Sequence, residues 1–298
     1  YEIKECDWSS DVCSSDLMKL YSIPTGNFKL DGGAMFGVVP KSMWSKVYPC
    51  DENNMCTWSM RCLLIEQGNR LMLIDNGIGD KQDEKFFRHY YLHGNDSMQK
   101  SLNNYGFSFD DITDVFLTHL HFDHCGGSIK WADSNKTKAI PAFKNAIYWC
   151  NESHWNWATN PNPREKASFL RENILPIKES GQLKMLNQDA EIVENVDILY
   201  MNGHTEAMMI PVINYNNTKI AFTADLLPCS HHIGMPWVMA YDVRPLESMN
   251  EKARFLKRAA DEKWILFFEH DAVNECATVV ETDKGVRVDQ LFHSKEIF

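Results

Sequence analysis

Short apolar runs separated by turn residues recur along the chain and predict a protein built mainly of strands. In the N-terminal half, Met60–Glu66 and Leu71–Asp75 flank the hairpin signal Gln67–Arg70, and Thr113–Thr118 is a short, mostly buried run. Further predicted strands are Ala146–Trp149, Ile192–Met201, Met208–Asn214, Lys219–Thr223, Trp264–Phe268, Thr278–Glu281 and Val286–Leu291. The pattern therefore predicts two groups of strands.

Segments with a helical spacing of apolar positions are fewer, and they interrupt both groups of predicted strands. The predicted helices are Asp83–His89, Ser97–Tyr105, Arg164–Asn173 and Leu246–Asp261. We therefore expect a sheet-on-sheet core that is covered by helices on the outside.

Two segments show neither the pattern of a strand nor the spacing of a helix and are predicted to be loops. One is Gly32–Tyr48, which is Gly-rich and then contains Met and Trp, and the other is Asn151–Pro163, which holds two tryptophans. Loops of this kind often line pockets. Their apolar side chains could equally pack on the domain, and the sequence leaves both interpretations open.

The first 17 residues differ from the rest of the chain. Asp7–Leu17 has no hydrophobic period, repeats Ser-Ser-Asp and matches the translation of a sequencing adapter, whereas Met18 begins a plausible protein. We expect residues 1–17 to be a disordered, non-native artefact and residues 18–298 to form a single domain. A genuine disordered N-terminus is the alternative.

Composition and charge narrow the class of protein. Hydrophobic residues make up 44% and aromatic residues 12% of the chain, which is typical of globular proteins. The net charge of −11, with no cluster of Lys and Arg, argues against nucleic acid and anionic membrane as partners. We see no signal peptide after Met18 and no apolar run long enough to span a membrane, and therefore expect a cytoplasmic protein.

Cysteine usage points to a reduced protein. An odd number of cysteines follows Met18, and none of them form a Cys-x-x-Cys motif. Cys50 and Cys56 could pair, but buried or loop thiols fit this pattern better.

The most informative segment is His119–His124, which packs three imidazoles and a carboxylate into six residues directly after a predicted strand. A catalytic zinc keeps one position open to water, so four ligand-type side chains this close suit two adjacent metal ions better than one. A few exposed histidines on a loop are the alternative interpretation. Three further candidates, His204, Asp225 and His270, each follow an apolar run. Because open sheets hold their sites at strand ends, we expect all of them to meet.

The pattern resembles the metallo-β-lactamase superfamily, whose His-x-His-x-Asp-His motif is followed by a separate His, Asp and His. The resemblance implies an α+β fold, an αββα sandwich of two mixed β-sheets flanked by helices, with a dinuclear site between the sheets. It also implies ligands, with His119, His121 and His204 on the first metal, Asp123, His124 and His270 on the second, Asp225 bridging them, and Asp75 beneath the metals orienting a ligand imidazole.

Within the superfamily the chain is most similar to quorum-quenching N-acyl homoserine lactonases, over Met18 to Phe298. The matching segments are Asp31–Pro40, Ala224–Pro228 and Phe267–Asp271. The resemblance implies a metal-dependent hydrolase that opens the lactone ring with a metal-bridging hydroxide, with Asp123 and Asp225 as catalytic residues. These lactonases carry a tyrosine three residues after the bridging Asp, where this chain has Pro228.

The resemblance also implies cofactor, substrate and partners. Two Zn²⁺ ions per chain are expected, with manganese, cobalt or iron as alternatives. The substrate is a small lactone or ester, and exposed Met and Trp loops suggest a homodimer. The expected pocket residues are Met35, Phe36, Trp155, Trp157, His231, His232 and Tyr241, of which the last three are candidates to replace the missing tyrosine.

Other functions of the same superfamily stay open. A glyoxalase-II-like thioesterase and an organophosphate or other ester hydrolase are the main alternatives. A non-catalytic metal-binding member is less favoured, because all seven expected ligands are present. The histidines outside the motif, among them His154, are expected to be surface or packing residues.

Overall fold

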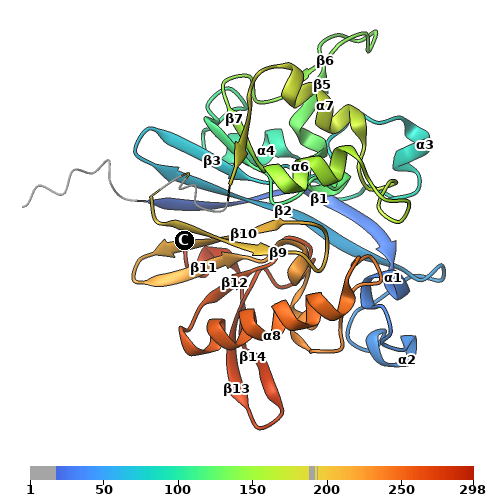
Figure 1. Cartoon of the computed structure of the whole chain (residues 1–298), viewed down its shortest axis with the longest axis vertical. Coiled ribbons are helices and arrows are strands. Elements are labelled where there is room, and N and C mark those ends of the chain that lie inside the picture. Colours follow the sequence, from blue (N-terminus) through green and yellow to red (C-terminus); the bar gives the residue numbers. More distant parts are fainter. Residues whose placement is uncertain (1–17, 188–191, 193) are drawn as a thin grey trace, which may run out of the picture.

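Two six-stranded sheets lie face to face, and helices cover their outer faces (Figure 1). This computed structural model describes residues 18–187, 192 and 194–298. The arrangement confirms the expected αββα sandwich with two mixed sheets. The segment 1–17, interpreted above as an artefact, lies outside the described residues.

The first sheet joins antiparallel and parallel pairs in the order β1-β2-β3-β4-β7-β8. Its first three strands are antiparallel neighbours, and its last three pairs are parallel. The strands are β1 (Lys19–Asp31), β2 (Met55–Gln67), β3 (Arg70–Ile74), β4 (Asp114–Phe116), β7 (Ile147–Asn151) and β8 (Leu183–Leu186).

The second sheet has the order β14-β13-β12-β11-β10-β9, with one parallel pair, β11 and β12, at its centre. Its strands are β9 (Val196–Met201), β10 (Met208–Tyr215), β11 (Thr218–Phe222), β12 (Ile265–Phe267), β13 (Cys276–Thr282) and β14 (Gly285–Phe292). A small separate sheet pairs β5 (Ile129–Trp131) with β6 (Ala139–Pro141).

The helices are short except for the last. They are α1 (Gly32–Phe36), α2 (Lys41–Trp44), α3 (Glu84–Phe87), α4 (Met98–Asn104), α5 (Phe122–Cys125), α6 (Glu152–Thr159), α7 (Arg171–Glu179) and α8 (Pro245–Asp261). In Figure 1, α4, α6 and α7 lie on the side of the first sheet, and α8 lies on the side of the second.

Strand β2 shows how the sandwich is held together. Leu63 and Ile65 belong to the apolar core shared with the second sheet, whereas Cys62 and Leu64 belong to the core beneath the outer helices. All four are almost fully buried. Because alternate residues of a strand point to opposite faces, this run has no polar positions and its burial fixes the register of β2.

Strand β1 was not predicted, and two predicted segments differ in the structure. The long strand β1 was missed because Pro24 and Gly26 interrupt its apolar pattern, and the register with β2 shifts between Pro24 and Asn27. The helix predicted over Arg164–Asn173 is wrong, since α7 begins only at Arg171. The segment Asn151–Pro163 is not all loop, because the Asn151 side chain accepts a hydrogen bond from the backbone N–H of His154 and caps α6.

The expected loop Gly32–Tyr48 also contains α1 and α2. Within the described residues every cysteine is a free thiol. This includes Cys50 and Cys56, whose backbones pair opposite each other in an isolated β-bridge. No helix in the described part of the chain has the length and apolar character needed to cross a membrane.

Candidate metal centre

The candidate ligands stand directly after strands of both sheets. His119 to His124 follow β4, Asp225 lies in a short 3-10 helix (Ala224–Leu226) after β11, and His270 follows β12. β4 is parallel to β3, and β12 is parallel to β11, so the carboxyl ends of these strands point to the same edge of each sheet. The facing sheets therefore bring side chains that are far apart in sequence to one place.

Four buried side chains form a first group, His119, His121, His204 and Asp225, whose ligand atoms lie within 4.8 Å of one another. His121 Nδ1 lies 3.1 Å from His119 Nε2 and 3.2 Å from His204 Nε2. Asp225 Oδ2 lies 3.1 Å from His204 Nε2 and 3.8 Å from His119 Nε2. These atoms converge as the ligands of one ion would.

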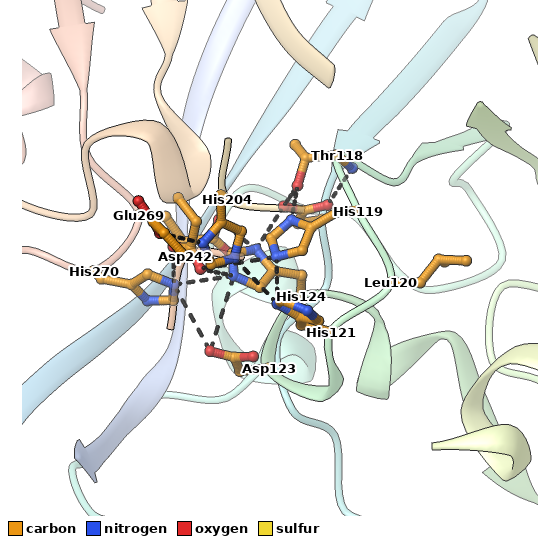
Figure 2. Close-up of polar contacts among 12 residues, drawn as sticks. Thr118, His119, Leu120, His121, Asp123, His124, His204, Asp242, Glu269 and His270 are labelled. Carbon is orange, nitrogen blue, oxygen red and sulfur yellow. Dashed lines mark hydrogen bonds and ion pairs between the residues drawn. The ribbon is translucent and has the colours of Figure 1, made fainter. Parts of the chain in front are cut away.

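Asp123, His124 and His270 form a second buried group beside the first. His124 Nε2 and His270 Nε2 are 3.1 Å apart, and Asp123 Oδ2 lies 3.9 Å and 3.8 Å from them. Asp225 joins the groups, because its Oδ1 lies 3.2 Å from His270 Nε2 while its Oδ2 faces the first group. Figure 2 shows the imidazoles directed at a common centre, with Leu120 pointing away.

Charge is distributed unevenly over these imidazoles. Burial lowers the pKa of His119, and its imidazole neighbours lower it further, so this imidazole is neutral. Burial also acts to lower the pKa of His204, but the carboxylates of Asp225 and Asp242 outweigh it and raise that pKa to about 10. Burial would raise the pKa of Asp225, but His124, His204 and His270 hold it well below its ordinary value.

Asp75 lies beneath the cluster, as expected of an orienting residue. Its Oδ2 lies 3.0 Å from His124 Nδ1, and its two oxygens accept hydrogen bonds from the backbone N–H and hydroxyl of Thr118. Glu269, which the sequence interpretation missed, reaches the same nitrogen at 3.0 Å. Burial raises the pKa of Glu269 to about 8, so this carboxyl carries its proton near neutral pH.

Three more polar residues around the site were also missed. Asp242 faces His204 Nδ1, and Glu165 faces His121. His154, expected to be a surface or packing residue, is buried and links two ligand loops. Its Nε2 accepts a hydrogen bond from the backbone N–H of Leu120, and its Nδ1 donates to the carbonyl of Glu206. No spacing in the sequence signals these contacts, which only the tertiary fold creates.

A cavity of about 300 Å³ opens over both groups. Its floor includes His121, Asp123, His204, Asp225 and His270. Its walls mix apolar and polar side chains, namely Leu30, Met35, Tyr90, Phe122, Arg164, Glu165, Ala167, Ser168, Met239, Ala240 and Tyr241. A larger cavity of about 470 Å³ lies elsewhere and contains none of the seven candidate ligands. The smaller cavity is therefore the candidate substrate site.

Of the seven expected pocket residues, only Met35 and Tyr241 line this cavity. Phe36 is fully buried in an apolar cluster and stacks on His232, and Trp155 is buried in the core under the first sheet. Those two expectations are wrong because both rings are packing residues.

The expectations for Trp157 and the two histidines are corrected as well. The Trp157 indole N–H donates to Glu165 from behind the cavity wall. His232 Nε2 donates to the carbonyl of Met35 and its Nδ1 contacts Cys229, so neither nitrogen is free for a substrate. His231 packs between Tyr48 and Trp237.

The electrostatics of the site fit a metal cofactor. Besides the protonated Glu269, five buried carboxyl groups surround the imidazoles. In the described part of the chain none of the five forms an ion pair with Lys or Arg: Asp75, Asp123, Glu165, Asp225 and Asp242. Buried charge is costly unless it is compensated, and divalent cations would compensate it here. The imidazoles and carboxylates of the two groups are donors that suit zinc and also accept manganese, cobalt or iron.

Comparison with known proteins agrees with this geometry. The model of the Metallo-beta-lactamase superfamily matches residues 61–270. The N-acyl homoserine lactonase AiiA of Bacillus thuringiensis subsp. kurstaki is 24% identical over 283 residues, which cover 91% of this chain and 96% of that protein.

Solved structures share the fold across nearly the whole chain. A probable metal-dependent hydrolase from Staphylococcus aureus is 30% identical with a TM-score of 0.84, covering 93% of this chain and 97% of that one. AidC, a dizinc quorum-quenching lactonase solved in complex with a product, is 21% identical with a TM-score of 0.74, covering 94% and 96%.

Proposed function

The chain is a metal-dependent hydrolase that belongs to the metallo-beta-lactamase superfamily, and from that premise we propose that it opens the lactone ring of N-acyl homoserine lactones. The observation that carries the proposal is the position of Asp225, which offers one oxygen to each ligand group on the floor of a partly apolar cavity. Relatives named as lactonases support the substrate class. We also propose that residues 18–298 act as one hydrolase domain.

The proposed cofactor is a pair of zinc ions. One ion would be held by His119, His121 and His204, and the other by Asp123, His124 and His270. Asp225 would contact both ions. Bound there, two zinc ions would activate water and polarise the substrate carbonyl.

The chain's own residues then handle protons and orientation. When the water oxygen attacks the lactone carbonyl carbon, Asp225 accepts the proton that the water loses. It returns that proton to the alkoxide oxygen as the ring C–O bond breaks. Asp225 is placed for this role because it lies on the cavity floor between the two ligand groups. Asp75 holds the His124 ring in place from below.

Tyr241 is the proposed donor to the substrate carbonyl oxygen. It lines the cavity, whereas Pro228, at the position of the tyrosine in similar lactonases, offers no donor and instead accepts the backbone N–H of His270 through its carbonyl. Partial burial and the carboxylates of Asp123 and Asp225 raise the pKa of Tyr241, so its phenol keeps the proton that it donates. A donor aimed at developing negative charge stabilises the transition state.

The cavity walls favour an acylated lactone over a glutathione thioester. Leu30, Met35 and Met239 supply apolar surface for an acyl chain. Arg164 is the one Lys or Arg in the lining, and its guanidinium already donates to the carbonyls of Ala240 and Asp242. Glutathione carries two carboxylates, and the cavity has no cluster of basic groups to receive them.

The test is turnover by zinc-loaded protein on N-acyl homoserine lactones of short to long acyl chain, measured by proton release. We expect ring opening that depends on bound metal and is lost after chelation. A glutathione thioester and an organophosphate triester serve as competing substrates. Faster turnover of either one, or no metal-dependent turnover of any lactone, would contradict the proposal.

A further inference from the structure

Glu165 is a buried carboxylate beside the metal groups that the mechanism above does not use. It lies between α6 and α7, is only 3% exposed, and forms part of the cavity wall. It belongs to neither ligand group. Its Oε1 has no hydrogen-bond partner in the described part of the chain, although a buried carboxylate oxygen normally has one.

The partner that Glu165 faces is His121. The Nδ1 atom of this imidazole points to His119 Nε2 and His204 Nε2, at 3.1 Å and 3.2 Å, so its Nε2 points away from the centre. That outer Nε2 lies 3.6 Å from Glu165 Oε1. Neither atom forms a hydrogen bond of normal geometry with another described residue, and the Thr205 hydroxyl, which also lacks a partner, is the other group beside this carboxylate.

The other side of the Glu165 carboxylate is firmly held. Its Oε2 accepts hydrogen bonds from the indole N–H of Trp157 at 2.7 Å and from the Asn162 amide at 2.6 Å. The Trp157 ring is covered in turn by Arg244, whose guanidinium lies 5.1 Å from the ring centre. With Oε2 engaged, Oε1 is left directed at His121.

We propose that Glu165 is a positioning residue for the metal centre, which accepts the proton on His121 Nε2 and thereby keeps His121 Nδ1 free to bind the first metal. The inference rests on the proposed metal centre. A neutral imidazole carries one N–H, and the hydrogen bond made by one nitrogen decides which nitrogen can bind a metal. Without a fixed acceptor at Nε2, His121 would also populate the tautomer with a proton on Nδ1, which cannot ligate.

The main test replaces Glu165 by glutamine and measures zinc affinity against a chromophoric chelator. Glu165→Gln keeps the side-chain volume and an acceptor for Trp157, but it turns an amide N–H towards His121 Nε2. We expect the zinc ion at His119, His121 and His204 to bind roughly 10- to 100-fold less tightly, with the thermal midpoint of unfolding of the metal-free protein unchanged. Glu152→Gln, at the exposed start of α6, is the matched control and should bind zinc as the wild type does.

A second measurement needs no variant, and so decides the question if Glu165→Gln fails to fold. Long-range proton–nitrogen spectra of metal-free wild-type protein with ¹⁵N-labelled histidine report which His121 nitrogen carries the proton. We expect a protonated Nε2 and an unprotonated Nδ1 before any metal binds. A merely structural role for Glu165 would not fix this tautomer.

The outcomes separate the two proposals. If the wild type and Glu165→Gln bind two zinc ions equally well, the proposed role of Glu165 is wrong and the proposed metal centre still holds. A protonated His121 Nδ1 has the same consequence. Wild-type protein that binds no zinc overturns both.

Discussion

Asp242 Oδ1 lies 2.9 Å from His204 Nδ1, so a carboxylate from the loop before α8 orients an imidazole from the loop after β9. The backbones of the two loops are also joined, because Val243 N–H donates to the His204 carbonyl and Arg244 N–H to the Gly203 carbonyl. His204 therefore cannot turn without moving Asp242. The contact leaves His204 Nε2 directed at Asp225 Oδ2, 3.1 Å away.

Replacing Asp242 by asparagine should weaken metal binding. The amide cannot match the charge of the carboxylate at His204 Nδ1, and loss of such a partner typically costs 10- to 100-fold in metal affinity. We expect a loss within that range for the first ion, measured by zinc titration. Asp197→Asn, at the exposed far end of β9, should leave the affinity unchanged. Equal affinities for all three proteins would contradict the role of Asp242.

Replacing Asp225 by alanine should abolish hydrolysis and lower the metal content of the purified protein. This carboxylate is the one side chain shown here to lie within 4 Å of His119, His124, His204 and His270 at once. Its removal takes one oxygen from each proposed ligand set. Metal analysis should give fewer than two ions per chain, and turnover at the wild-type rate would refute the proposed role.

The sequence predicts the seven clustered residues because each stands in a motif or directly after an apolar strand. Metal-ligating residue types at strand ends are a local signal, and two packed sheets bring those ends together. Asp242, Glu165 and His154 carry no local signal, since they act through loops that only the tertiary fold places beside the ligands. Glu269 stands next to His270 in the sequence, but nothing in the sequence shows that it contacts His124.

The same contrast holds for the fold. Strand β2 was recognisable because both of its faces are buried, whereas β1 was hidden by Pro24 and Gly26 at an irregular point of its pairing. The tryptophans of α6 were expected at the pocket because residue type alone does not show where a ring points. Trp155 fills the core, and Trp157 supports the site from behind.

Arg61 should be a strong determinant of stability. Its Nη1 donates to the carbonyls of Phe268 and Asp271, at 2.8 Å and 2.9 Å, so it holds both ends of the loop that carries His270. Arg61→Met would leave these carbonyls without that donor. We expect the free energy of unfolding to fall by about 3 kcal/mol, measured by urea denaturation. Arg287→Met, exposed on β14, should change it by less than about 0.5 kcal/mol.

Asp114 should make stability depend on pH in the acid range. Burial would raise the pKa of Asp114, but hydrogen bonds from Arg70, Thr113 and Trp149 outweigh it and hold that pKa below its ordinary value of 3.8. A group whose pKa is lower in the folded chain stabilises the fold above its unfolded pKa. That stabilisation is lost as the pH falls through the folded pKa. The free energy of unfolding of the wild type should therefore exceed that of Asp114→Asn by the full amount at neutral pH, and this difference should shrink below pH 3.8.

Urea denaturation of both proteins at neutral pH and at about pH 3 measures this difference. We expect the wild type to be more stable by about 2 kcal/mol at neutral pH, since charged hydrogen bonds contribute on that scale. Comparing the two proteins at each pH removes the effect of the other carboxylates. A difference that stays constant between the two pH values would contradict the assignment to Asp114.

Removing the Tyr241 hydroxyl should slow the reaction rather than weaken substrate binding. A donor to the developing oxyanion acts mainly in the transition state, so Tyr241→Phe should lower kcat about 100-fold with little change in KM. Tyr90 lines the same cavity and offers a second phenol, whose pKa burial raises to about 12. Tyr90→Phe is therefore the matched control, and we expect its kcat to stay near the wild-type value. If Tyr90→Phe instead loses kcat while Tyr241→Phe keeps it, the donor is Tyr90 and the assignment to Tyr241 is wrong.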